Sequence, residues 1–225
     1  MTSAACSSRI ALTATLSYTS SVDGHEIHGV SALTMPDRPD GANLGGIVGV
    51  DLMLGRLAVL DFGCRTAALL PMNSPLSVAG PRAQPVRAGS IPGGQQLTLA
   101  VTVNGAPGLA VLDSGSRSTI INMKFASAAN LDLESPAFHC GEPARGATRK
   151  AVSSLAGPIG TVRFAGITRK AATARIVDLP FLQESGLSNT PVMTLGLDLL
   201  QGTRVTVSYS ARRFWVAPSR CPPAP

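Results

Sequence analysis

Apolar and polar residues alternate along several short stretches of this chain, with turn-forming residues between them. The clearest stretch is 97–103, Leu-Thr-Leu-Ala-Val-Thr-Val, which is followed by Asn104-Gly105 and a second apolar stretch at 108–112. Alternation with a period of two is typical of a half-buried β-strand, and Asn-Gly is a strong signal for a tight hairpin turn. The pattern therefore predicts a β-hairpin at Asn104 and Gly105.

A second alternating stretch lies near the C-terminus, at 203–209. We expect one set of its side chains to face the interior of a closed β-barrel and the other set to face solvent. The interior set is Val205, Val207 and Tyr209, and the solvent set is Arg204, Thr206 and Ser208.

Signals for helices are few. Asn122 is a favourable cap for a short helix that runs to about Asn130. The 225 residues are 44% apolar but only 14% charged, and they include 23 Gly and 17 Pro, which is typical of short strands and many turns. We therefore predict a mainly β fold. No apolar run approaches the roughly 18 residues of a membrane-spanning helix, so we expect no membrane span.

The net charge of +6 comes from cations that are spread along the chain rather than gathered in a run. Aromatic residues make up only 4% of the chain, and proteins that bind nucleic acids commonly combine basic and aromatic side chains. The sequence therefore predicts no nucleic-acid partner. The given residues include no clear signal peptide, and they leave the compartment open, export included if the natural N-terminus lies upstream.

The chain contains no familiar metal pattern. The cysteines Cys6, Cys64, Cys140 and Cys221 form no C-x-x-C pair, and their pairing stays open. His25 and His28 follow an Asp-Gly turn in a strand context, whereas zinc-binding histidines of this kind need helical i, i+4 spacing. We expect no metal and no cofactor.

Part of the sequence occurs twice. The segment that begins at Gly49 aligns without a gap on the segment that begins at Gly196, 147 positions later. The identical pairs are Gly49/Gly196, Asp51/Asp198, Leu52/Leu199, Gly55/Gly202, Arg65/Arg212 and Pro71/Pro218. In both copies an apolar strand leads through a Gly and a short helical turn into an alternating strand.

The repeat suggests a domain organisation. We predict a truncated first unit at 1–71, a Pro/Gly-rich linker at 72–94 and a complete second unit at 95–220. We expect Asp51 and Asp198 to cap the helical turns, and Asp61, which aligns with Ser208, to be solvated. The front half of the first unit would fall before Met1, which favours a chain whose natural start lies upstream.

The most specific motif is Val111-Leu112-Asp113-Ser114-Gly115, an apolar strand that delivers an Asp into a tight turn. Asp, Ser and Gly also form ordinary turns, so the motif alone does not decide between a turn and a site. About 80 residues later comes the apolar-apolar-Gly sequence Thr194-Leu195-Gly196. Together with the repeat, this arrangement resembles the tandem retropepsin-like aspartic proteases, whose first repeat would here be truncated.

The resemblance implies two related barrels, an endopeptidase activity on extended polypeptides, and Asp113 as a catalytic carboxyl. It also implies that Ser114 holds the direction of that carboxylate and that Gly115 lets the backbone approach closely. Hydrolysis by this chemistry needs two carboxyls that share a proton. The second Asp would come from the front of the first unit, as an intramolecular pseudo-dimer, or from a homodimer.

The family also folds a β-hairpin over the substrate. Here it would lie between the helix near Asn130 and the strand that begins at Thr161. The alternative is a protease-like relic without activity, which serves as a binding or structural module. The single Asp-Ser-Gly turn favours that alternative.

Overall fold

The computed structural model describes residues 16–22, 25–32, 49–80, 84–90, 96–145 and 151–221. Strands dominate, which confirms the predicted mainly β class. The chain divides into two compact units, 1–47 and 48–225. The predicted domain boundaries at 71 and 94 differ from this division and stay a prediction.

In the compact unit 1–47 the structure describes one antiparallel hairpin, formed by β1 (Leu16–Val22) and β2 (His25–Ala32). His25 and His28 therefore lie on a strand, as the sequence predicts. The register of the hairpin shifts once, between Tyr18 and Ser20.

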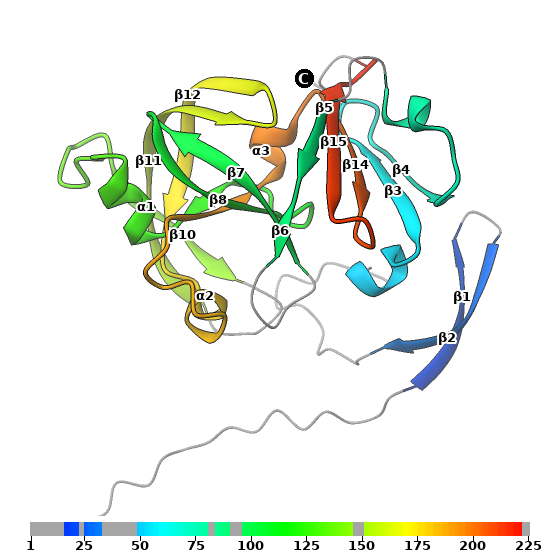
Figure 1. Cartoon of the computed structure of the whole chain (residues 1–225). Coiled ribbons are helices and arrows are strands. Elements are labelled where there is room, and N and C mark those ends of the chain that lie inside the picture. Colours follow the sequence, from blue (N-terminus) through cyan, green and yellow to red (C-terminus); the bar gives the residue numbers. More distant parts are fainter. Residues whose placement is uncertain are drawn as a thin grey trace, which may run out of the picture. The chain divides into compact units, whose positions relative to one another are not determined.

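In the compact unit 48–225, six strands pair in a closed ring, in the order β7, β8, β13, β9, β12, β11 and back to β7. Figure 1 shows this barrel mostly in green and yellow. Two further strands extend it, since β10 pairs with β11 and β6 pairs with β7. The bounds are β6 Gly89–Ser90, β7 Leu97–Val103, β8 Ala106–Leu112, β9 Ile120–Ile121, β10 His139–Arg145, β11 Ala151–Phe164, β12 Ile167–Ile176 and β13 Val192–Leu195.

The predicted hairpin at Asn104 is confirmed. β7 and β8 pair as far as Val103 and Ala106, and Asn104 and Gly105 take positive φ values of 50° and 88°. This left-handed backbone suits Asn and Gly, and it matches the twist of the two strands.

Two short helices cover the barrel, and the predicted cap is confirmed. α1 spans Met123–Ala128, and the Asn122 side chain accepts a hydrogen bond from the Phe125 N–H. α2 spans Pro180–Glu184. The main core includes the nearly inaccessible side chains of Phe125, Ile121, Ile159, Met193 and Leu195.

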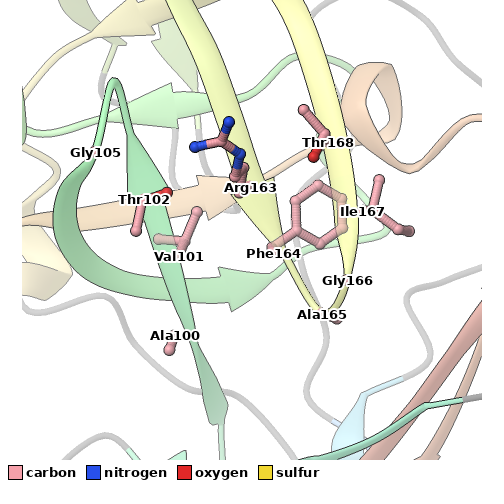
Figure 2. Close-up of a pocket in the computed structure, with 10 residues that line it drawn as sticks. All are labelled: Ala100, Val101, Thr102, Gly105, Arg163, Phe164, Ala165, Gly166, Ile167 and Thr168. Carbon is pink, nitrogen blue, oxygen red and sulfur yellow. The ribbon is translucent and has the colours of Figure 1, made fainter.

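The barrel closes where β11 meets β7, and a surface hollow of about 620 Å³ lies beside this junction. Figure 2 shows Arg163 and Phe164 on β11 beside Ile167 and Thr168 on β12, with Thr102 on the neighbouring strand. Asp113 does not line this hollow. The hollow is therefore separate from the Asp-Ser-Gly turn.

A second sheet of five strands has the order β4, β3, β14, β15, β5. Its first two strands come from the first copy of the repeat and the next two from the second copy. The bounds are η1 Val50–Met53, β3 Arg56–Asp61, β4 Thr66–Pro71, η2 Leu76–Ala79, β5 Gln84–Arg87, α3 Leu197–Leu200, β14 Thr203–Ser208 and β15 Arg213–Pro218. The range predicted as a linker thus contains η2, β5 and β6.

The two copies share backbone details. Gly55 and Gly202 have φ values of +70° and +68°, and Arg65 and Arg212 have +54° and +49°. The two hairpins also pair in the same register, because Arg56 lies opposite Pro71 and Thr203 lies opposite Pro218. Each of these positions differs from its counterpart by 147. The matched geometry supports the repeat that the sequence predicts.

The prediction for the two faces of β14 was wrong. Val205 and Val207 are buried, but so are Thr206 and Ser208, each with 0% exposure. The reason is that β14 lies in the middle of the five-stranded sheet rather than in a barrel wall. The main core covers one face, and η2 packs near Leu57 and Trp215 on the other face.

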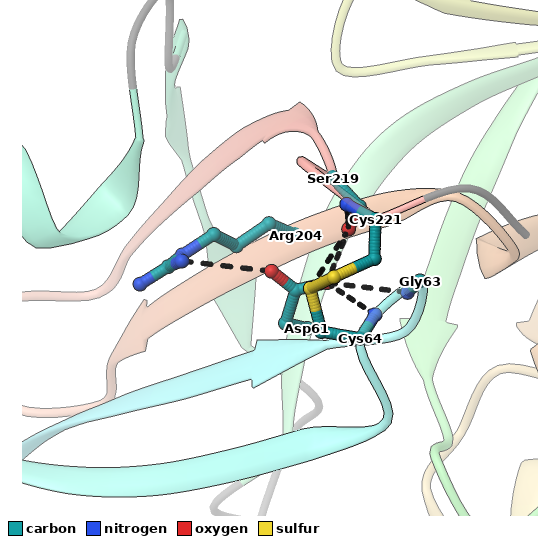
Figure 3. Close-up of polar contacts among 6 residues, drawn as sticks. All are labelled: Asp61, Gly63, Cys64, Arg204, Ser219 and Cys221. Atoms are coloured by element: carbon teal, nitrogen blue, oxygen red, sulfur yellow. Dashed lines mark hydrogen bonds and ion pairs between the residues drawn. A yellow bond between two sulfur atoms is a disulfide. The ribbon is translucent and has the colours of Figure 1, made fainter.

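The prediction that Asp61 is solvated was also wrong, since only 3% of it is exposed. Its Oδ1 accepts hydrogen bonds from the Gly63 and Cys64 N–H groups and from the Ser219 hydroxyl, and its Oδ2 lies 3.5 Å from Nη1 of Arg204. Figure 3 shows this cluster beside the disulfide. Burial by itself would raise the pKa of Asp61, but these hydrogen bonds and the Arg204 charge lower it below its usual value.

A disulfide joins Cys64 to Cys221, 157 positions apart. It ties the turn between β3 and β4 to the segment after β15, and so connects the two copies of the repeat. Of the cysteines in the described part of the chain, Cys140 is free and exposed. Cys6 lies outside the described residues.

Candidate active site

Asp113 lies at the point where a buried strand ends. β8 carries the buried residues Ala110 and Val111, and the chain becomes exposed at Asp113, Ser114 and Gly115. An apolar strand that ends in a tight turn can therefore present a carboxylate to solvent while its base is fixed in the core.

The turn from Asp113 to Thr119 passes over the end of β13. β13 pairs in parallel with β8 on one side and antiparallel with β9 on the other, so the same strand supports both ends of the turn. The Asp113 N–H donates to the Leu195 carbonyl at 3.1 Å, and the Leu197 N–H donates to the Ser116 carbonyl at 2.9 Å.

Gly115 orients the carboxylate. Its N–H donates to Oδ1 of Asp113 at 2.9 Å, and a Cβ at this position would lie 3.3 Å from the same oxygen. The hydrogen bond to the carboxylate therefore comes from the backbone of Gly115. The hydroxyl of Ser114 lies on the exposed part of the turn.

The backbone beneath the turn requires glycine at position 196. A Cβ on Gly196 would lie 2.6 Å from the carbonyl carbon of Ser118 and 2.8 Å from the nitrogen of Thr119. Any side chain would push the turn away from the end of β13. This close approach gives a physical reason for the apolar-apolar-Gly sequence that ends at Gly196.

Asp198 does not cap α3, contrary to the prediction. The N-cap of this helix is Gly196, without a side-chain hydrogen bond. The Asp198 carboxylate instead accepts hydrogen bonds from the N–H and the hydroxyl of Thr119, across 79 positions of sequence. The side chain of Asp51, the predicted cap in the first copy, lies outside the described residues.

Sequence reasoning missed this role because Asp198 and Thr119 carry no local signal of contact. A weak signal was present, since an acidic residue two positions after the paired Gly occurs in both copies. Only the crossing of β13 under the turn brings the two residues together.

The predicted hairpin after α1 is present, formed by β10 and β11. It begins at His139, and residues 146–150, between its two strands, lie outside the described residues. The predicted start of a strand at Thr161 was wrong, because Thr161 lies within β11, which begins at Ala151. Residues of this hairpin help to line a hollow of about 340 Å³, together with Arg175 and Asp198. The described residues contain no group of three or more potential metal ligands.

The site thus combines an exposed Asp on an Asp-Ser-Gly turn with a supporting strand that leads into Gly196. Residues 99–199 match the aspartyl protease family model. This match confirms the predicted resemblance to aspartic proteases, and it supports aspartic protease function in general. The aspartyl protease segment runs from β7 to α3, so it includes the whole turn and the hairpin after α1.

Among solved structures, one similar chain is described as a retropepsin-like aspartic protease from Rickettsia conorii. It is 12% identical, with a TM-score of 0.43, over 60% of this chain and 89% of that chain. Another is the EIAV protease complexed with the inhibitor HBY-793, 20% identical with a TM-score of 0.33, over 47% of this chain and 85% of that chain. No curated protein sequence matches this chain.

No helix among the described residues has the length and apolar character that crossing a membrane would require.

Proposed function

We propose that this protein is an aspartic endopeptidase in which Asp113 is one of two catalytic carboxyls. The observation that carries the proposal is the exposed Asp113 carboxylate, held by the Gly115 N–H on a turn that β13 supports from below. This turn lies inside the aspartyl protease segment. Gly115 orients the carboxylate, and Ser114 acts in support of the turn.

The chemistry requires a pair. One ionised carboxylate takes a proton from a water molecule, which attacks the peptide carbonyl carbon, while a neutral carboxylic acid donates its proton to the carbonyl oxygen. Two carboxyls held close together share one proton, because ionising both is unfavourable, and they titrate as a coupled pair. Asp113 alone supplies one half of this arrangement.

We propose that the second carboxyl comes from a second turn of the same kind, related to the first by a two-fold axis. The source is either a further part of the first repeat or another copy of the chain. The matched register of the β3–β4 and β14–β15 hairpins supports such an arrangement. The β1–β2 hairpin also supports it, because its register shifts three residue pairs from the Val22–His25 end. The register of the β11–β12 hairpin likewise shifts three residue pairs from its Phe164–Ile167 end.

The proposed substrate is an extended polypeptide. A chain in this conformation binds by adding a strand to protein edges, with side chains in alternate pockets. The β10–β11 hairpin is the proposed lid, because residues of both its strands line the hollow near Asp198.

The second candidate is a module that binds without catalysis. The observation in its favour is that the described residues contain one Asp-Ser-Gly turn.

Cleavage of a peptide library at mildly acidic pH, with and without Asp113→Asn, tests the proposal. Asp132→Asn is the matched control, because Asp132 is also exposed and also accepts an N–H bond from the residue two positions later. We expect Asp113→Asn to abolish cleavage and Asp132→Asn to leave it unchanged. Cleavage that survives Asp113→Asn would rule out Asp113 as catalytic, and a folded wild-type chain without activity would favour the binding module.

A further inference from the structure

The Asp198 carboxylate is the most heavily bonded acidic group near the Asp113 turn. Its two oxygens lie 3.0 and 2.9 Å from the Thr119 nitrogen, and Oδ1 also lies 2.7 Å from the Thr119 hydroxyl and 2.9 Å from the Leu199 nitrogen. Thr119 is fully buried. Three of these contacts join the carboxylate to Thr119, so they fix the far end of the turn.

The same contact is coupled to the strand end beneath the turn. The Gly196 N–H donates to the Thr119 hydroxyl at 3.2 Å, so this hydroxyl accepts one bond and donates another. The bond from Asp113 to Leu195 holds the start of the turn, and the bond from Leu197 to Ser116 holds its middle. The contact with Thr119 holds its end. Gly115 lies between the first two of these points, and its N–H donates to the Asp113 carboxylate.

The helix α3, which carries Asp198, is itself fixed in position. The Arg169 guanidinium on β12 donates to the Leu199 and Gln201 carbonyls at the end of α3. Leu199 and Leu200 are buried in the main core. These contacts hold the C-terminal end of α3, and the bond from the Leu197 N–H to the Ser116 carbonyl holds its start. A carboxylate on α3 therefore has a defined position relative to β9 and β13.

We infer that Asp198 is a positioning residue for Asp113, which acts through Thr119 to keep the Gly115 N–H on the catalytic carboxylate. This inference rests on the proposed function. Asp198 does not touch the substrate in this role and exchanges no proton with it. The other charged or titratable groups that line its hollow are His139 on β10 and Arg175 on β12.

Three variants test the inference. Asp198→Ala removes the acceptor, and Asp198→Asn keeps one oxygen that can accept the Thr119 bonds. The matched control is Asp178→Ala, because the Asp178 carboxylate also accepts a backbone N–H, that of Met123, but outside the turn. We expect Asp198→Ala to lower kcat by about 100-fold with little change in KM, since small displacements of a catalytic group have effects of this size. Asp198→Asn restores most of the rate, and Asp178→Ala matches the wild type.

A readout independent of activity separates this inference from the proposed function. NMR titration of the Asp113 carboxyl carbon, together with the chemical shift of the Gly115 amide, reports on the turn directly. Both should change in Asp198→Ala and stay unchanged in Asp178→Ala. If a folded Asp198→Ala variant leaves both signals and kcat as in the wild type, the inference is wrong.

The proposed function fails if the wild type cleaves no peptide. In that case the NMR signals alone test whether Asp198 positions Asp113. Should Asp198→Ala not fold, Thr119→Val and Thr119→Ser replace it. Thr119→Val removes the hydroxyl and should shift the Gly115 amide, whereas Thr119→Ser keeps the hydroxyl and should not. Equal spectra for these two variants would overturn the inference.

Discussion

Val59 and Thr206 occupy the same position in the two copies of the repeat, and they lie directly opposite each other in the pair β3–β14. Adding 147 to Val59 gives Thr206, so the antiparallel pairing is symmetric about this one pair of residues. The register on either side agrees, because Ala58 lies opposite Val207 and Leu60 lies opposite Val205. A local two-fold axis therefore passes between these strands, as expected for two like hairpins that pair with each other.

The symmetry is broken at Asp61, whose counterpart in the second copy is Ser208. Asp61 has a lowered pKa, so its ionised form stabilises the fold above the usual carboxyl pKa of 3.8, and this contribution is lost as the pH falls through the lowered value. We expect Asp61→Asn to lower the free energy of unfolding at pH 7 by about 2 kcal/mol. The difference from wild type should shrink at pH 3, measured by urea unfolding. An equal difference at both pH values would contradict the assignment.

The disulfide between Cys64 and Cys221 closes a loop of 157 positions. Such a long loop predicts a loss of about 3 to 5 kcal/mol in stability when the bond is removed. We expect Cys64→Ser/Cys221→Ser to unfold at lower urea concentration than wild type, and to become insensitive to added reductant. Cys140→Ser is the control, because Cys140 is free and exposed, and it should behave as wild type does. A reductant effect that persists in the double variant would disprove the role of this bond.

Thr206 has a fully buried hydroxyl with no hydrogen-bond partner among the described residues. An unsatisfied buried polar group destabilises the folded state. Thr206→Val has nearly the same shape, and we expect it to raise the free energy of unfolding by about 1 kcal/mol. Thr203→Val is the contrast, because the Thr203 hydroxyl donates to the Leu200 carbonyl and its loss should destabilise. Thermal unfolding of both variants checks the opposite signs.

Gly196 is predicted to be intolerant of a side chain. Gly196→Ala places a Cβ against the backbone of Ser118 and Thr119, and we expect a loss of about 2 to 3 kcal/mol in stability together with lower peptide cleavage. Gly166→Ala is the control, since Gly166 has a positive φ of 77° but no atom within 4 Å of its Cβ position. It should lose about 1 kcal/mol through backbone strain and keep its activity. Equal effects of the two variants would show that the contact at Gly196 is unimportant.

Local elements were predictable where a few neighbouring residues decide the backbone. The Asn104-Gly105 turn and the Asn122 cap are of this kind, because each depends on groups within a few positions of one another. The exposed Asp113 turn was also readable from an apolar run that stops at a turn former. The faces of β14 were not, because burial of Thr206 depends on η2 and on strands far away in the sequence.

The sequence by itself determined that the chain is mainly β, that one segment occurs twice, and that Asp113 stands at the end of an apolar strand. Only the tertiary structure decided that the two copies share one sheet, that Asp61 is buried beside the Cys64–Cys221 disulfide, and that Asp198 holds Thr119. Periodicity and turn chemistry act over a few residues, whereas these contacts join positions from 79 to 158 apart. Their partners are chosen by strand pairing and burial, which no local pattern encodes.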